Sequence, residues 1–484
     1  MIDKTPITPS SDHTAMAEYW TLVETLMGGA KAIRAQPKYL PKFENETQQA
    51  YDIRRQNAKF TNIYRDIVEN LAQRPFASEV QITESAPASI KEFIEDVDGR
   101  GNHLHVFAGE IFFAGINAAV DWIMVDFTSG VPDGATKADE KRIGVRPYWV
   151  RIPAASVLAA YSAMINGKEE FVHVRIHEPE TVRDGFGEKT TDRVRVLERP
   201  DLGDGMYGPA TYQVWEKKKE GTHGKEEWVK TDDAGPISIG VIPIVPFVTG
   251  RRIGASWRLH PPMRDAADLQ IEHYQQESAL KHIEELTAFP MLAGNGVAPP
   301  EKDGKILPVP VGPQAVLYAP PHGDKAGGSW SFIEPGAQSL RFLLDHIKET
   351  AQQLRELGRQ PLTAQSGNLT VITTAFAAQK GNSAIQAWAL NLKDALEQAF
   401  VLTLMWLKES GTVEVKIDTD FDLGMGDDDS FVHVLAMVAG DDPLISREVA
   451  LSEARRRNIL SADYDAEKDE DEITKDMTRD FEFH

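Results

Sequence analysis

The sequence of 484 residues contains no cysteine. Disulfide bonds, thiolate metal sites and cysteine nucleophiles are therefore excluded, and a reducing compartment is permitted. Long apolar runs are also missing. The best candidate, Ile111–Val125, is shorter than a membrane span and contains Asn117 and Asp121, so we interpret it as a buried segment. The stretch Met1–Ser11 is polar, and we expect no secretory signal there.

Basic residues are scarce relative to acidic ones. Lys and Arg number 52 against 74 Asp and Glu, which gives a formal net charge of −22. This balance argues against a protein that wraps nucleic acid on a basic surface, because such binding depends on neutralising phosphates. It does permit a protein that lets DNA pass without holding it. The length suggests about three structural units.

Motifs for catalysis are also missing or incomplete. The chain has no GxSxG elbow, and Gly304-Lys305 is followed by Ile306 rather than by the Ser or Thr of a P-loop. GDGMYG at 203–208 matches the dinucleotide fingerprint in its letters. However, Pro209 and a strand-like segment follow it instead of a helix, so we predict a hairpin turn there. We therefore expect neither catalysis nor a cofactor.

Two histidine pairs have a spacing that could suit a metal site. His103 and His105 would share one face of a strand, where a carboxylate such as Asp121 could join them. His173 and His177 are placed in the same way. Neither pair has a convincing third ligand at local spacing, so ordinary histidines are favoured over a metal site.

An aspartate-rich segment runs from Asp418 to Asp429 and resembles a calcium loop only superficially. An EF-hand needs glycine at its sixth position and glutamate at its twelfth. Here those positions hold Leu423 and Asp429, which favours a solvated loop without a metal.

Hydrophobic periodicity predicts an α+β protein. Helices are expected at Ala15–Met27, from Thr47 to Pro75, and at Ser89–Asp98, Pro262–Thr287, Ala337–Leu357, Ser383–Lys408 and Ser446–Arg457. Strands are expected at Tyr148–Val150, Phe171–Ile176, Arg193–Leu197, Tyr212–Glu216, Gly240–Phe247 and Thr412–Ile417. The segment His103–Trp122 is apolar and fits either a helix or a buried strand. Two prolines in Gly240–Phe247 favour an edge strand.

The order of these elements along the chain is similar to that of a known protein family. Two long helices flank a Pro/Gly-rich insert, and a polar segment and a third long helix follow. Together with the strings at Tyr39–Asn62, Ile242–Phe247, Pro261–Gly296 and Leu354–Leu390, this order resembles the portal proteins of tailed bacteriophages, the head-to-tail connectors. The likeness covers roughly residues 15–460 and points to a little-characterised branch of that family.

The resemblance implies a portal fold with seven parts. These are an N-terminal wing (1–255), a first stem helix (256–288), a clip (289–335), a second stem helix (336–359), a tunnel loop (360–382), a long helix with a wing strand (383–427) and a C-terminal crown or acidic tail (428–484).

It also implies a function without catalysis. A portal forms a homo-oligomeric ring, of twelve copies in the family, at one vertex of the capsid in the virion. Double-stranded DNA passes through it during packaging and ejection. Its partners are the major capsid protein, scaffolding protein, terminase and then a neck or tail adaptor, and it assembles in the bacterial cytoplasm. Alternatives are another phage head-tail structural protein, or a hydrolase with a His/Asp site.

The resemblance assigns roles to three sets of residues. For the stem, we expect Leu340, Leu344, Ile347 and Leu354 to be buried between helices, with Lys348 and Arg355 near the channel or a subunit interface. The tunnel loop would present polar side chains to DNA, namely Gln365, Ser366, Asn368, Thr370, Thr373, Thr374, Gln379 and Lys380. The clip would contact its partners through Lys302, Asp303, Lys305, His322, Asp324 and Lys325.

Overall fold

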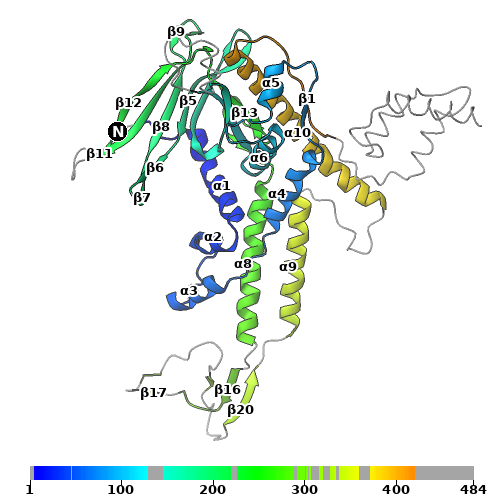
Figure 1. The fold of residues 1–484 in the computed structure, drawn as a ribbon. Helices are drawn as coiled ribbons and strands as arrows, with labels where there is room; N and C mark the ends of the chain where they lie inside the picture. Colours follow the sequence, from blue (N-terminus) through cyan, green and yellow to red (C-terminus); the bar gives the residue numbers. More distant parts are fainter. Residues whose placement is uncertain are drawn as a thin grey trace, which may run out of the picture. The chain divides into compact units, whose positions relative to one another are not determined.

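The computed structural model describes residues 5–44, 46–128, 145–219, 226–287, 291–299, 301–302, 305–306, 316–319, 328–333, 337–358 and 371–419. The chain divides into two units, Met1–Asp418 and Thr419–His484. The elements below belong to the first unit, which combines helices and antiparallel sheets in an α+β fold (Figure 1). The predicted helix Ser446–Arg457, the acidic tail and most of the aspartate-rich segment lie outside the described residues.

Six helices come from the N-terminal part of the chain. They are α1 (Ser11–Met27), α2 (Gly29–Arg34), α3 (Gln48–Asn57), α4 (Ile63–Gln73), α5 (Ala88–Phe93) and α6 (Leu104–Ala118), with short 3-10 turns at Pro37–Tyr39, Arg74–Phe76 and Ala154–Ser156. The Ser10 hydroxyl accepts a hydrogen bond from the His13 backbone N–H, which caps the start of α1. The predicted helices at 15–27 and 89–98 correspond to α1 and α5.

The single long helix expected from Thr47 to Pro75 is wrong. Thr47 does cap α3, but the helix ends at Asn57 and a second one starts at Ile63. The Asn62 side chain accepts a hydrogen bond from the Arg65 N–H and so caps α4. Between the two helices, the ring of Phe60 packs edge-on against the ring of Tyr274, which is distant in the sequence. The break is thus fixed by tertiary contacts.

The apolar segment after residue 103 contains both a helix and a strand. The helix α6 ends at Ala118, Ala119 adopts a left-handed conformation with φ 73°, and β2 (Val120–Phe127) follows. Ile111–Val125 is largely buried, as predicted. None of the helices in the described part of the chain combines the length and apolarity that crossing a membrane requires.

The strand β2 is the middle of a three-stranded sheet with the order β13-β2-β3, in which β3 is Pro147–Ile152 and β13 is Ile244–Val248. The predicted edge position of the proline-containing strand is confirmed, with Pro246 opposite Trp122. Both α6 and the later helix α10 (Val371–Leu407) contact this sheet. Trp149 on β3 lies at the centre of an aromatic cluster, 4.8 Å from Phe400 between ring centroids.

A five-stranded antiparallel sheet has the order β12-β11-β8-β5-β4. Its strands are β4 (Val157–Ile165), β5 (Lys168–His177), β8 (Arg193–Glu198), β11 (Thr211–Lys219) and β12 (Glu226–Pro236). Two hairpins extend from it, β6 (Glu180–Asp184) with β7 (Gly187–Thr191) and β9 (Asp201–Gly203) with β10 (Met206–Tyr207). The GDGMYG letters form the second hairpin, with left-handed Gly203, Asp204 and Gly205 at its turn, so the predicted hairpin is confirmed.

A pair of long helices follows a small hairpin of β14 (Arg251–Arg252) and β15 (Leu259–His260). The helices α8 (Arg264–Thr287) and α9 (Ala337–Leu357) lie side by side, and their predicted bounds are confirmed to within two residues (Figure 1). Between them come β16 (Met291–Asn295), β17 (Glu301–Lys302), β18 (Lys305–Ile306), β19 (Val316–Ala319) and β20 (Ser329–Ile333). After α10, β21 (Val415–Lys416) pairs with β1 (Gln81–Ile82).

Candidate functional site

The paired helices and their insert hold most of the residues that the resemblance singled out. The two helices run antiparallel, because the strand after α8 pairs with the strand before α9, Met291 opposite Ile333. At its other end the pair is anchored in the N-terminal helices. There, Gln270 of α8 accepts a hydrogen bond from the Tyr64 N–H and donates one to the Thr61 carbonyl. The pair is therefore fixed at one end and carries the insert at the other.

The buried side of α8 is polar, which sequence reasoning missed. Both oxygens of the buried Glu277 carboxylate are bonded, one to the Thr61 N–H and the other to the Thr61 hydroxyl and to Lys59 Nζ at 2.9 Å. Burial raises the pKa of Glu277, but these bonds outweigh it and hold the pKa below its usual value. Burial lowers the pKa of the neighbouring His273, which the Glu277 carboxylate offsets only in part.

The predicted burial of the α9 stripe is only partly correct. Ile347 and Leu354 are buried, with 7% and 0% of their surface exposed, and Leu340 is half-buried. Leu344 is 42% exposed, so its predicted burial between helices is not met within the single chain. The side of α9 that meets α8 and α4 is centred on Ile347, Thr350 and Leu354, and Leu344 lies on the flank of that side.

Lys348 and Arg355 are exposed on the chain and take part in surface ion pairs. Lys348 Nζ lies 3.3 Å from Asp345 of the same helix, and an Arg355 guanidinium nitrogen lies 3.1 Å from Asp66 of α4. Exposed pairs of this kind contribute little to stability, about 0–1 kcal/mol. Their expected location near a channel or a subunit interface stays a prediction.

The insert contains a small three-stranded sheet with the order β19-β16-β20. The strand β16 pairs in parallel with β19 and antiparallel with β20, and Trp330 on β20 is 51% exposed. Among the expected clip residues, Lys302 and Lys305 are opposite each other in the β17–β18 hairpin. The other four lie outside the described residues, namely Asp303, His322, Asp324 and Lys325.

A helix occupies the second half of the segment that was expected to form the tunnel loop. The helix α10 begins at Val371, twelve residues before the predicted start at Ser383. Thr373, Thr374, Gln379 and Lys380 therefore belong to a helix, which is a correction to the loop at 360–382. The segment is rich in alanine, and a helix of 37 residues can tolerate the cost of about 1 kcal/mol for Gly381. Gln365, Ser366, Asn368 and Thr370 lie outside the described residues.

The histidines considered as metal ligands have structural roles. His103 and His105 lie at the start of α6 rather than on a strand, and His103 Nδ1 accepts a hydrogen bond from the His105 N–H. His105 Nδ1 accepts one from the Val80 N–H. On β5, His173 and His177 lie 3.8 and 3.3 Å from single carboxylates on neighbouring segments. Within the described ranges, no three His, Asp or Glu side chains gather in a way that could hold a metal ion.

The carboxylate considered with these histidines makes a different interaction. Asp121 is fully buried on β2 and accepts a hydrogen bond from Arg151 Nε. Burial raises the pKa of Asp121 to about 7, although the Arg151 guanidinium lowers it. This is an ion pair within the protein rather than an acid–base pair with a histidine.

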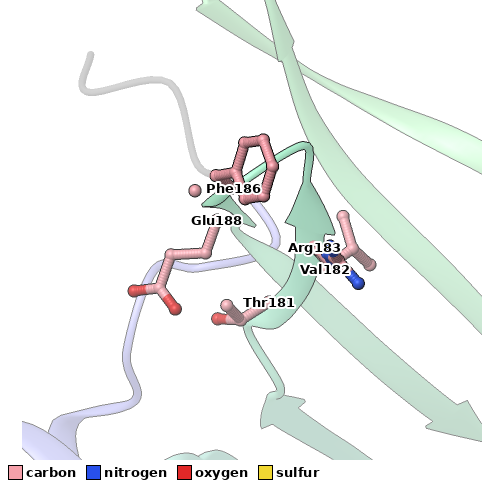
Figure 2. A pocket seen from close by; sticks show the side chains of 6 residues that line it. Thr181, Val182, Arg183, Phe186 and Glu188 are labelled. Atoms are coloured by element: carbon pink, nitrogen blue, oxygen red, sulfur yellow. The ribbon is translucent and has the colours of Figure 1, made fainter.

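Two of the hollows on the described surface are considered in turn, and neither gathers catalytic groups. One is lined only by the β6–β7 hairpin, where Thr181, Val182, Arg183, Phe186 and Glu188 surround an open space (Figure 2). Phe186 at its tip is fully exposed. The other lies between the start of α1 and the start of α8, and its polar lining includes Arg258, His260 and Arg264.

Comparisons with known proteins add a family and a set of distant structures. Residues 262–407, which span the paired helices, the insert and the whole of α10, match a family described as a domain of unknown function, DUF4055. No curated protein matches the chain. One similar solved structure is described as "Neck of empty GTA particle computed with C6 symmetry", with 11% identity, a TM-score of 0.42, and 81% of this chain and 89% of that chain covered. Another is described as "Neck of native GTA particle computed with C12 symmetry", with 12% identity, a TM-score of 0.40 and the same coverage.

Proposed function

We propose that this chain is a structural subunit of the head-to-tail junction of a tailed phage or phage-like particle, and specifically its portal protein. The observation that supports the proposal most is the path of the chain through α8, the insert and α9. A long helix leaves the N-terminal helices, a small sheet follows, and a second long helix returns to α4. This is the order of stem helix, clip and stem helix that the resemblance implies, and the bounds of both helices fit it.

In this role the chain assembles into a closed ring, and the paired helices surround the passage for DNA. Twelve copies with a net charge of −22 each would carry about −260 in total. A strongly acidic wall repels phosphates, which favours the passage of DNA over its retention. The terminase and later a tail adaptor would dock on the insert, since loop-rich surfaces suit changing partners.

The rival enzyme proposal has less support. A hydrolase with a His/Asp site would need His103 or His105 to face a carboxylate in a hollow. Both residues instead accept backbone hydrogen bonds at the start of α6. A different head-tail structural protein is the other alternative. Ring formation separates a portal from a hydrolase, and the DNA-passage experiment below separates it from another head-tail protein.

The ring is tested by the mass of the purified full-length protein. Twelve × 53.7 kDa gives about 640 kDa for the family's ring size. We expect analytical ultracentrifugation and native mass spectrometry to find one dominant assembly near that mass, or near another whole-number multiple large enough for a ring. A monomer or dimer at all concentrations would contradict the proposal.

The DNA passage is tested in the segment before and within α10. Replacing Gln365, Asn368 and Gln379 together with lysine adds three positive charges to each subunit. If these side chains face DNA, the variant forms rings as the parent does but packages or retains DNA poorly, and more so at low salt, because lysine–phosphate contacts release counterions. Unchanged packaging at every salt concentration would show that the segment does not line the passage.

A further inference from the structure

The exposed side of α8 is acidic. Among residues 264–284 of this helix, the four most exposed residues are all acidic: Asp265, Asp268, Glu272 and Glu284. The side chain of Arg264, at the start of the helix, is 42% exposed and pairs with Asp268. The first three recur at spacings of three and four residues, so they share one side of the helix. Buried Gln270 and Glu277 lie on the opposite side. We call Asp265, Asp268 and Glu272 the acidic side of α8.

The helix α9 carries a basic stripe. Its Lys and Arg residues are Arg341, Lys348 and Arg355, all exposed and separated by intervals of seven. Seven residues are nearly two helical turns, so the three side chains lie along one flank. Leu344, which is 42% exposed, falls between the first two. We call Arg341, Leu344, Lys348 and Arg355 the basic stripe of α9.

These two surfaces do not pair within one chain. Asp268 interacts with Arg264 of its own helix at 3.4 Å, and Lys348 with Asp345 of its own helix at 3.3 Å. Arg355 pairs with Asp66 of α4 at 3.1 Å, also at an exposed position. The two helices instead contact each other through the buried side of α9 that includes Ile347. The local pairs are exposed and weak, so they can be exchanged for new partners at little cost. One chain therefore presents two complementary surfaces outward.

We propose that the acidic side of α8 in one subunit packs against the basic stripe of α9 in the next copy of this chain. The inference rests on the proposed ring and names the contact that joins its subunits. Two different surfaces on one chain form a head-to-tail interface, which generates a ring when the rotation closes. Opposite charges set the register, and the like charges of two α8 or two α9 surfaces reject the wrong pairing. Leu344 then gains in the ring the apolar contact that it lacks in the chain.

Charge complementarity favours a second copy over DNA as the occupant of the basic stripe. DNA would explain the arginines and lysine of α9, but it would leave the acidic side of α8 unexplained. A neighbouring copy accounts for both surfaces with one contact.

The test uses charge reversals on the full-length chain. The first variant carries Lys348→Glu and Arg355→Glu, the two cations of the stripe that are nearest the level of the acidic side, so both of its surfaces are acidic. The second carries Asp268→Lys and Glu272→Lys, so both are basic. A third variant combines all four changes, and a control carries Glu349→Lys and Glu356→Lys on another side of α9. Thermal unfolding of each variant checks that the fold is retained, and sedimentation measures ring formation.

We expect each of the first two variants to need a protein concentration about tenfold or more above the parent's to form rings, because attraction becomes repulsion. An equimolar mixture of the two restores rings, since each acidic surface again meets a basic one. The combined variant restores rings alone, and the control assembles as the parent does.

Other results separate the two proposals. If the parent forms no ring at all, the proposed function fails. If the parent forms rings and the first two variants assemble equally well, the ring stands and this interface is wrong. If both variants lose rings but neither the mixture nor the combined variant regains them, the two surfaces do not pair with each other. If reversal of the basic stripe spares rings but changes DNA retention, the stripe faces DNA and the inference is overturned.

Discussion

Replacing Gly115 with alanine should destabilise the fold, although alanine is the better helix former. Gly115 lies in α6, where a Cβ would come within 2.3 and 2.5 Å of two ring carbons of Phe247. Normal carbon–carbon contacts are about 3.5–4.0 Å. The Phe247 ring has no surface exposed and stacks on buried Phe112 at 5.7 Å between ring centroids. The helix is also fixed here by a 2.7 Å hydrogen bond from the Thr249 hydroxyl to the Gly115 carbonyl. Neither partner can move without disturbing the core.

The magnitude follows from two opposing effects. Helix propensity favours alanine by about 1 kcal/mol, and overpacking a core costs about 1–3 kcal/mol or more. Because both closest contacts are too short by about an ångström or more, we expect a net loss of about 1–2 kcal/mol in the free energy of unfolding. Gly109 on the same helix is the matched control, since a Cβ there meets nothing within 4 Å. Gly109→Ala should stabilise by up to about 1 kcal/mol.

Urea unfolding followed by tryptophan fluorescence measures both variants against the parent at equal protein concentration. The reasoning requires the midpoint of Gly115→Ala to fall and that of Gly109→Ala to stay or rise. A Gly115→Ala variant as stable as Gly109→Ala would refute the packing of α6 against β13.

Two further predictions concern α9 and β2. Leu354→Ala should lower the free energy of unfolding by about 2–5 kcal/mol, because Leu354 is fully buried and its truncation leaves a cavity. Leu344→Ala should lower it much less in unassembled protein, because Leu344 is exposed. Equal losses in the two variants would show that the buried side of α9 is assigned wrongly. Burial raises the pKa of Asp121 to about 7, whereas the pKa of an unfolded aspartate is about 3.9. Between these two pH values the folded chain binds a proton that the unfolded chain has lost. The free energy of unfolding therefore falls as the pH rises from about 4 to about 7. Denaturant midpoints measured from about pH 4 to 7 should fall less steeply with pH in Asp121→Asn than in the parent. Parallel curves for the two proteins would contradict the raised pKa of Asp121.

Strong local patterns made much of the fold predictable. The helix α9 has an apolar stripe with helical spacing, which predicts its observed bounds, Ala337–Leu357. The hairpin at 203–208 and the edge strand at Ile244–Val248 follow from glycine and proline, whose backbone limits are local.

The features that were missed depend on contacts between distant segments. Periodicity places Leu344 on a stripe, but it does not say how much of that stripe α8 and α4 cover. The break before Ile63 depends on Thr61 binding Glu277 of α8. Hydrophobic periodicity cannot predict the polar buried side of α8, because Gln270 and Glu277 have the side chains of surface residues and their hydrogen-bond partners lie far away in the sequence. The early start of α10 at Val371 extends a strong helix into a polar segment.

The central claim is that copies of this chain form a closed ring around a passage for DNA. Electron cryo-microscopy of the purified protein, averaged in views down the symmetry axis, tests it most directly. The proposal predicts a ring with one rotation axis and an open centre wide enough for duplex DNA, with the α8–α9 pairs of neighbouring subunits in contact around it. Particles without a rotation axis, or a ring whose centre is closed by these helices, would contradict it.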